Sequence, residues 1–170
     1  YGSADPGRIM SAVTQVGDIL FPQLAKRMPG IIPVGIDQDP HIRLSRDVVS
    51  RTKQMKFVPP SSLYHKYMPS LDGGLKMSKS NPLFAISLPE DMSSVKKKIS
   101  KALTGGRDTI EEHRKLGAIV EKDMVFELLK QYLVEDDKEL QKIYDEYKSG
   151  KMLSGEIKQL ATEKMETFMN

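Results

Sequence analysis

The N-terminal part of the chain alternates helix-like and strand-like stretches separated by proline and glycine, and this pattern constrains the fold more than any other feature. Apolar residues recur at helical spacing from Arg8 to Arg27, and Met28-Pro29-Gly30 ends that period. The apolar run Ile31–Ile36 is too short for a helix and predicts a strand buried on both faces. Asp39-Pro40 then predicts the cap and first turn of a second helix. This order of elements indicates a parallel α/β sheet.

The second half of the chain has a different pattern, with several helix starts and no convincing strand after about residue 87. Residues that favour helix N-termini precede amphipathic stretches at Ser87–Glu90, Asp108–Glu111, Asp123, Asp136 and Ser154. Glycines end two of these stretches, at Gly105-Gly106 and at Gly150. The C-terminal half is therefore predicted to be a small helical bundle.

Composition excludes several classes of protein. Hydrophobic residues make up 39% and charged residues 29% of the 170 residues, which is a globular balance. The chain has no cysteine, so disulfide scaffolds, cysteine zinc sites and thiol chemistry are excluded. No apolar run approaches the roughly 20 residues that a membrane helix needs. The three histidines are scattered without ligand spacing, so no protein-held metal is expected.

The segment that follows the predicted strand is the first candidate site. In open α/β sheets, ligands bind beyond the carboxyl ends of the strands, near helix N-termini. Gly35 allows a ligand close to the backbone, Asp37 can accept two hydrogen bonds such as a ribose diol offers, and Gln38 can both donate and accept. From this segment alone, an ordinary strand-to-helix turn is the preferred interpretation.

The second candidate site, Leu71–Pro82, is more informative. Two adjacent glycines precede two lysines, Lys76 and Lys79, which have serine hydroxyls beside them. Lysines on such a loop can fold over a triphosphate and neutralise the charge that builds on a leaving pyrophosphate. Small residues allow the loop to open and close. Ordinary polar loops rarely have this string, so we interpret it as a phosphate-binding loop.

These segments carry a family resemblance. Lys76–Ser80 reads KMSKS and resembles the signature loop of class I aminoacyl-tRNA synthetases. Gly35–Asp47 is similar to the GxDQDP…RD segment of the tryptophanyl-tRNA synthetase family. Gly105–Arg114 resembles a segment of the archaeal and eukaryotic branch of that family, and Met152–Glu156 resembles a further one. The resemblance covers nearly the whole chain.

The resemblance implies roles for the residues of the lysine loop. Lys76 and Lys79 would be the catalytic residues, because they would bind the ATP phosphates and stabilise the transition state of amino-acid activation. Met77 and Ser78 would complete the ATP-binding loop through backbone and hydroxyl contacts. Met68, which precedes the loop, would line the adenine site.

The resemblance also implies roles for residues of the first half. Gly35 and Asp37 would hold the ribose of ATP, and Gln38 would contact the amino group of tryptophan. Gln15 and Asp18 share a helix face at positions i and i+3, where Gln15 would contact the ammonium and Asp18 would approach the indole side. Without the resemblance, Gln15 would be interpreted as a solvent-facing helical residue.

The fold class implied is α/β plus all-α. Residues 1–90 would form the C-terminal half of a Rossmann-type parallel-sheet catalytic domain, including the KMSKS loop. Residues 91–170 would form a helical anticodon-binding domain, truncated at its C-terminal end. The second signature of class I synthetases, a His-x-Gly-His-type motif, is absent. We therefore expect a C-terminal segment of a longer enzyme that is inactive alone.

The activity implied is tryptophan–tRNA ligation, in which ATP activates tryptophan as the adenylate and the acyl group passes to tRNA(Trp). Mg²⁺ would arrive with ATP rather than in a protein cage. The expected partners are tRNA(Trp), tryptophan and ATP, with a homodimer in the full-length enzyme, a cytoplasmic location and no membrane. Three alternatives remain open: a non-catalytic tRNA-binding or regulatory module derived from such a synthetase, a tyrosyl-type synthetase, and another adenylate-forming nucleotidyl transferase.

Overall fold

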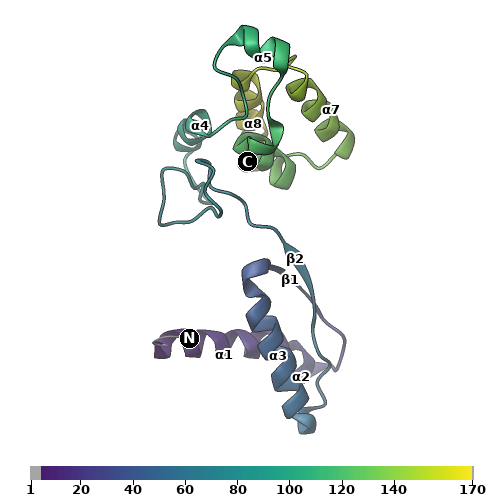
Figure 1. The fold of residues 1–170 in the computed structure, drawn as a ribbon. Helices are drawn as coiled ribbons and strands as arrows, with labels where there is room; N and C mark the ends of the chain where they lie inside the picture. The colour runs from purple at the N-terminus through teal and green to yellow at the C-terminus, as the bar shows by residue number, and fades with distance from the viewer. Residues whose placement is uncertain (1–4, 170) are drawn as a thin grey trace. The chain divides into compact units, whose positions relative to one another are not determined.

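The computed structural model describes residues 5–169, in two compact units that divide between Lys66 and Tyr67 (Figure 1). We call residues 1–66 the N-terminal unit and residues 67–170 the helical unit. The N-terminal unit contains α1 (Pro6–Leu20), α2 (Pro22–Ala25), β1 (Ile31–Gly35), η1 (Ile36–Gln38), α3 (Asp39–Arg51), η2 (Lys53–Met55) and β2 (Ser61–His65). The helical unit contains α4 (Met92–Lys101), α5 (Ile110–Leu116), η3 (Val120–Lys122), α6 (Met124–Leu128), η4 (Leu129–Leu133), α7 (Asp137–Lys148) and α8 (Ser154–Met169).

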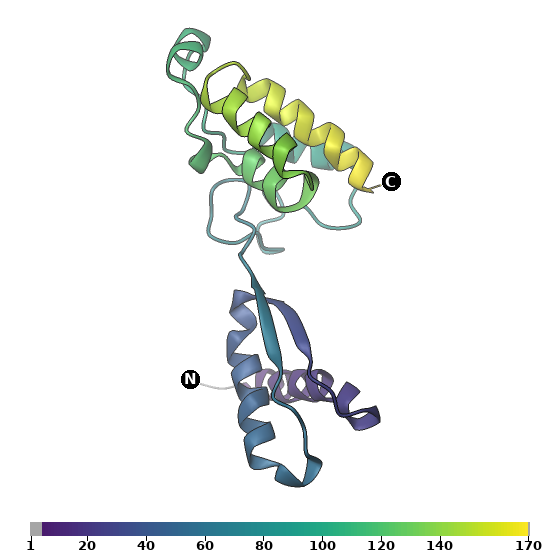
Figure 2. The ribbon, with the colours of Figure 1, turned by 90° about the vertical axis from the view of Figure 1, so that its right-hand side faces the viewer.

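Two parallel strands joined by a helix form the centre of the N-terminal unit. β1 pairs with β2 in a register that runs from Ile31 opposite Ser61 to Gly35 opposite His65. The connection between them contains α3, so β1, α3 and β2 form a βαβ unit (Figure 2). The predicted parallel sheet is confirmed. Because the strands are parallel, Gly35 and His65 lie at the same edge, where each strand ends.

The predicted burial of the first strand on both faces is wrong within this chain. Ile31 is 72% exposed, and on β2 Leu63 is 67% exposed. The physical reason is that β1 and β2 are the only two strands among residues 5–169, so neither has the covering layers that bury a larger parallel sheet.

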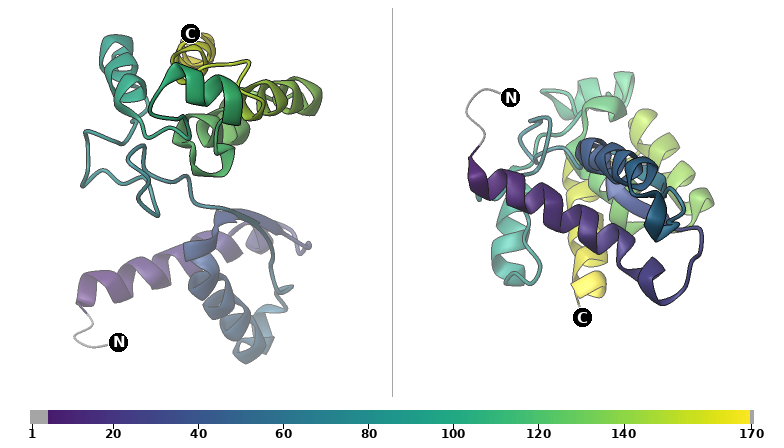
Figure 3. Two further views of the ribbon diagram at one scale, coloured as in Figure 1. Left: turned by 45° about the horizontal axis from the view of Figure 1, so that its top comes forward. Right: turned by 90° about the horizontal axis from the view of Figure 1, so that it is seen from below.

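The first helix is shorter than the sequence predicts. Asp5 accepts a hydrogen bond from the Gly7 amide and caps α1, which ends at Leu20 rather than near Arg27. A new short helix begins at Pro22, because proline has no N–H for a helix interior and fits a first turn. Val16 and Leu20 of α1 pack against Val49 of α3, and Figure 3 shows α1 (purple) and α3 (blue) crossing each other.

Local capping fixes the helix starts of the helical unit. Side chains of Thr109, Asp123 and Asp136 accept hydrogen bonds from amides in the first turns of α5, α6 and α7, as predicted. The predicted start at Ser87–Glu90 is wrong. Asp91 is the cap of α4 and accepts from the amides of Ser93 and Ser94, so the preceding residues stay outside the helix.

A buried carboxylate lies at the centre of the helical unit. Asp123 is 1% exposed and accepts hydrogen bonds from the Gly105 amide at 2.8 Å, the Phe126 amide at 2.7 Å and the Tyr147 hydroxyl at 2.7 Å. Burial raises the pKa of Tyr147, and the neighbouring Asp123 adds to that rise. The side chain of Asp123 therefore connects the loop after α4, the start of α6 and the C-terminal end of α7.

The string Gly105–Arg114 forms the structural corner around this carboxylate. A Cβ on Gly105 would lie 2.0 Å from the carbonyl oxygen of Ile119, so only glycine fits there. Arg107 donates to the Gly117 carbonyl at 2.9 Å, and the buried ring of His113 donates through Nε2 to the Met152 carbonyl at 2.8 Å. The segment that resembles the archaeal and eukaryotic branch thus has a structural role.

The division into compact units differs from the predicted division at residue 90. Met68 and Leu71 belong to the same core as Val95 and Ile99 of α4, so residues 67–90 pack as part of the helical unit. The functional division into residues 1–90 and 91–170 stays a prediction. Within residues 5–169, none of the helices is long and apolar enough to cross a membrane.

Candidate functional site

The carboxyl end of β1 positions the first pair of candidate residues. Gly35 ends the strand, and Asp37 follows in the single turn η1. A Cβ on Gly35 would lie 2.6 Å from Oδ1 of Asp37. Because Gly35 has no side chain, the Asp37 carboxylate can lie directly beside the end of the strand. The two residues predicted to hold ribose are therefore in close contact.

A hydrogen bond joins the two candidate glutamines. Nε2 of Gln15, on α1, donates to Oε1 of Gln38 at 2.9 Å, although the two residues are 23 positions apart. Both side chains are half-buried, so Gln15 is not the solvent-facing residue that its helix position suggested. Asp18 lies almost one turn further along α1, and its side chain is exposed.

Asp39 has a different role from the predicted helix cap. It is the first residue of α3, because η1 runs directly into the helix, and its carboxylate accepts a hydrogen bond from the Tyr64 hydroxyl of β2. Arg43, one turn later, pairs with it at 2.6 Å. The Tyr64 hydrogen bond and, less strongly, Arg43 keep the pKa of Asp39 below its usual value. No pattern in the sequence predicted this contact with Tyr64.

Arg46 explains another part of the same string. Its Nε donates to the Pro60 carbonyl at 2.9 Å and its Nη2 donates to the Ser62 hydroxyl at 3.2 Å. These bonds connect α3 to the start of β2. The arginine of the GxDQDP…RD segment therefore orients the strand whose carboxyl end lies beside Gly35.

Backbone hydrogen bonds anchor the lysine loop on the helical unit. The Met77 amide donates to the Met68 carbonyl at 2.7 Å, and the Leu71 amide donates to the Phe84 carbonyl at 3.0 Å. The amide of Ile86 donates to Sδ of Met77 at 3.3 Å. Met68 is buried and Met77 is half-buried, so the segments before and after the loop are fixed while its charged residues face outward.

Asp72 clamps the two ends of this loop, a role that the sequence analysis missed. Its carboxylate accepts from the Gly74 amide and from the Asn81 side chain, both at 3.1 Å. Hydrogen bonds from the Ser70 hydroxyl, then from Gly74 and Asn81, hold the pKa of Asp72 below its usual value. An aspartate two residues before a glycine is a recognised turn signal, and it could have indicated the first of these bonds.

The exposed part of the loop carries two cations and two hydroxyls. Nζ of Lys76 lies 4.9 Å from the ring centroid of Tyr67, within cation–π distance. The hydroxyls of Ser78 and Ser80 are 2.9 Å apart, and Lys79 is exposed between them. This arrangement can bind a polyphosphate, because mobile ammonium groups and hydroxyls can surround its oxygens at little desolvation cost. Among residues 5–169, no three His, Cys, Asp or Glu side chains form a cluster that could hold a metal ion.

Comparisons with known proteins give the family. The model of the family described as "tRNA synthetases class I (W and Y)" matches residues 12–170. This chain belongs to that family. The tryptophan–tRNA ligase of Methanocaldococcus jannaschii is 48% identical over 173 residues, which cover 99% of this chain and 46% of the relative. The class I synthetase chain therefore spans about half the length of the curated relatives it matches.

Solved structures agree with the family assignment. The tryptophanyl-tRNA synthetase from Aeropyrum pernix superposes with a TM-score of 0.90 at 42% identity, over 99% of this synthetase chain and 47% of its own. A tyrosyl-tRNA synthetase from Aeropyrum pernix has a TM-score of 0.72 at 22% identity over 98% of this chain and 48% of its own, which indicates a shared fold alone. Two classes of relative thus share the architecture, and tryptophan relatives share much more of the sequence.

Proposed function

We propose that this chain is the part of a tryptophan–tRNA ligase that carries the lysine loop, contacts for ribose and tryptophan, and a tRNA-binding helical region. The observation that carries the proposal is the hydrogen bond between Gln15 and Gln38, because it joins two residues assigned to tryptophan from separate parts of the sequence. High identity to tryptophan–tRNA ligases over nearly the whole chain supports the choice of amino acid. The tyrosyl alternative is not favoured.

The first half-reaction needs charge stabilisation more than acid–base chemistry. The carboxylate of tryptophan attacks the α-phosphate of ATP, pyrophosphate leaves, and the aminoacyl adenylate forms. Lys76 and Lys79 bind the phosphates and neutralise the charge that develops on pyrophosphate, while Met77 and Ser78 complete the loop. The clamp of Asp72 keeps the loop ends fixed while the exposed lysines move onto the phosphates.

The N-terminal unit supplies the remaining contacts in this proposal. Gly35 and Asp37 hold the ribose of ATP, since the glycine leaves room for the carboxylate beside the strand end. Gln15 and Gln38 bind the ammonium of tryptophan, Asp18 approaches the indole side, and Met68 of the helical unit lines the adenine site. Mg²⁺ arrives bound to the ATP phosphates.

The second half-reaction transfers the tryptophanyl group to the terminal ribose of tRNA(Trp). In this proposal, residues 91–170 form the anticodon-binding domain, and residues 1–90 belong to the catalytic domain. We further propose that the full-length enzyme is a cytoplasmic homodimer. The 170 residues contain no His-x-Gly-His motif, so we propose that they do not activate tryptophan on their own.

A chimera tests this proposal. The matching 46% of the Methanocaldococcus jannaschii ligase is replaced by this chain, and tryptophan-dependent ATP–pyrophosphate exchange is measured. We expect exchange with tryptophan and not with tyrosine, and none from the 170-residue chain alone. Lys76→Ala and Lys79→Ala each reduce kcat by about 10²–10³-fold, as expected for loss of a group that stabilises transition-state charge.

Lys96→Ala is the matched control, because Lys96 is an exposed lysine of α4 outside the loop and its removal leaves exchange unchanged. A folded chimera that exchanges with tyrosine, or that keeps its exchange rate after both loop substitutions, would contradict the assignment. Gln38→Ala tests the amino-acid contact separately, by a raised KM for tryptophan with little change in the KM for ATP.

A further inference from the structure

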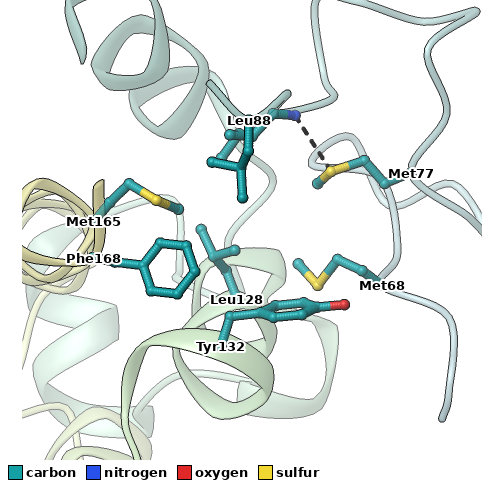
Figure 4. Close-up of a pocket in the computed structure, with 8 residues that line it drawn as sticks. Met68, Met77, Leu88, Leu128, Tyr132, Met165 and Phe168 are labelled. Atoms are coloured by element: carbon teal, nitrogen blue, oxygen red, sulfur yellow. Dashed lines mark hydrogen bonds between the residues drawn. The ribbon is translucent and has the colours of Figure 1, made fainter. Parts of the chain in front are cut away.

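An apolar pocket of about 240 Å³ opens on the helical unit beneath the lysine loop. Its floor is formed by Met68, Leu128 of α6 and Met165 of α8, which are 9% exposed or less. Its mouth is formed by Leu88, Tyr132 and Phe168, which are at least 45% exposed. Figure 4 shows these side chains arranged around a common central space. The pocket therefore has a buried base and an opening to solvent.

Met77, the second residue of the KMSKS string, forms part of the wall of this pocket. Two bonds fix it there. Its amide donates to the Met68 carbonyl at 2.7 Å. Its sulfur accepts from the Ile86 amide at 3.3 Å, which is the dashed line in Figure 4. The neighbours of Met77 in sequence are Lys76 and Ser78. A molecule in the pocket would thus contact the side chain of Met77, the residue that joins the exposed Lys76 and Ser78 of the loop.

The lining determines what kind of molecule fits. No charged side chain lines the pocket, and Tyr132 contributes the only polar side-chain group. A nucleotide or an amino acid would leave its charges unpaired there. An apolar cavity of roughly 150 Å³ is large enough to bind benzene, so this pocket has room for one aromatic ring or two fused rings. Its methionines can adapt to the outline of an aromatic ring and contact it favourably through sulfur.

We propose that this pocket is a binding site for a small uncharged aromatic molecule, and that its occupancy restrains the lysine loop through Met77. The pocket shares Met68 and Met77 with the ATP contacts proposed above, but none of the residues proposed to bind the ribose or tryptophan, and neither loop lysine, lines it. Binding of the aromatic molecule and restraint of the lysine loop can both be measured on the 170-residue chain, so neither depends on the proposed synthetase activity.

The test uses toluene as the probe and ¹³C-methyl-methionine NMR of the full 170-residue chain. Toluene causes saturable shifts of the Met68, Met77 and Met165 methyl signals, because an aromatic ring in the pocket lies beside them. The methyl of Met55, in the N-terminal unit, keeps its position. Benzoate, which has the same ring and a charge, causes no saturable shift at equal concentration. Absence of saturation up to the solubility limit of toluene, or equal binding of benzoate, would overturn the proposed site.

A tryptophan at the mouth separates pocket binding from general association with apolar surface. Leu88→Trp covers the opening and weakens toluene binding by about tenfold or more, a free-energy difference of at least about 1.4 kcal/mol. Leu83→Trp adds the same side chain at an exposed leucine outside the pocket and leaves the affinity unchanged. Equal affinity of both variants and the unmodified chain would refute the location.

Amide hydrogen exchange tests the coupling to the loop. The Met77 amide is hydrogen-bonded to the Met68 carbonyl, so its exchange reports opening of this part of the loop. Saturating toluene slows exchange at Met77, whereas the Ile119 amide, which donates to the Gly105 carbonyl and lies outside the pocket lining, keeps its rate. Binding of toluene without slower exchange at Met77 would refute the regulatory part of the inference and leave a simple binding pocket.

Discussion

Replacement of Glu90 by glutamine should destabilise the helical unit in a pH-dependent way. Nζ of Lys98 lies 2.5 Å from Oε1 of Glu90, and the two side chains are 15% and 14% exposed. The same carboxylate accepts from the Ser94 hydroxyl at 2.6 Å and from the Ser87 amide at 2.9 Å. Glu90 therefore attaches the segment that follows the lysine loop to the first turns of α4.

The magnitude follows from the pKa of Glu90. Burial opposes its ionisation, but hydrogen bonds from Lys98 and Ser94 outweigh burial and lower the pKa from 4.5 to about 2. A shift of that size corresponds to roughly 3 kcal/mol of stability at neutral pH, and partial exposure to solvent reduces this to about 1–2 kcal/mol. Because the folded pKa is depressed, this stabilisation is fully present above pH 4.5 and is lost as the pH falls toward 2.

Urea unfolding measures the effect, with the methyl NMR signals of Val95 and Ile99 as probes of the helical unit's core. The free energy of unfolding of Glu90→Gln is about 1–2 kcal/mol lower than that of the unmodified chain at pH 7, and the difference shrinks at pH 3. Glu166→Gln, at an exposed position of α8, is the matched control and shows neither effect. A difference that is independent of pH would refute the reasoning, because only an ionised Glu90 makes the bond to Lys98 a charge pair.

Two further substitutions test the centre of the helical unit. Gly105→Ala lowers the free energy of unfolding by about 3 kcal/mol or more, because the new Cβ would lie 2.0 Å from the Ile119 carbonyl oxygen. The control is Gly155→Ala, where the new Cβ has no neighbour within 4 Å. It is neutral or slightly stabilising in the same urea titration. Tyr147→Phe lowers it by about 1–3 kcal/mol, because the buried Asp123 loses a hydroxyl donor, and an unchanged urea midpoint would contradict this account of the network.

The features that the sequence predicts correctly are those that a few neighbouring residues determine. Thr109, Asp123 and Asp136 cap helices with amides two or three residues away, so each start follows from its own local string. The end of α7 is also local, because Gly150 adopts a φ of 77° just after the helix, a conformation that glycine favours. The parallel sheet also follows from local order, because a helix, a short apolar strand, a polar turn and a second helix are typical of one. The second strand, β2, was not predicted from the sequence.

The features that it misses depend on partners distant in sequence. Burial of β1 depends on which layers cover it, and the apolar string Ile31–Ile36 reads the same with or without them. Asp39 accepts a hydrogen bond from Tyr64, 25 positions away, and the link between Gln15 and Gln38 spans 23 positions. No propensity or spacing rule encodes these pairs, so the family resemblance could place Gln15 in a site where the helix pattern alone could not.

The two strings that carry the strongest resemblance differ in their physical reason for being there. Gly105–Arg114 is fixed by packing, since a side chain at Gly105 would overlap backbone and His113 is 3% exposed. Lys76 and Lys79 are exposed on a loop whose ends are held by other residues, so replacing either one removes charge without opening the core. Substitutions in the first string should therefore unfold the helical unit, whereas substitutions of the two lysines should leave its stability intact. A residue that acts in chemistry can be replaced without loss of stability, and only the two lysines meet this condition. The lysine loop therefore supports the proposed function, whereas Gly105–Arg114 does not.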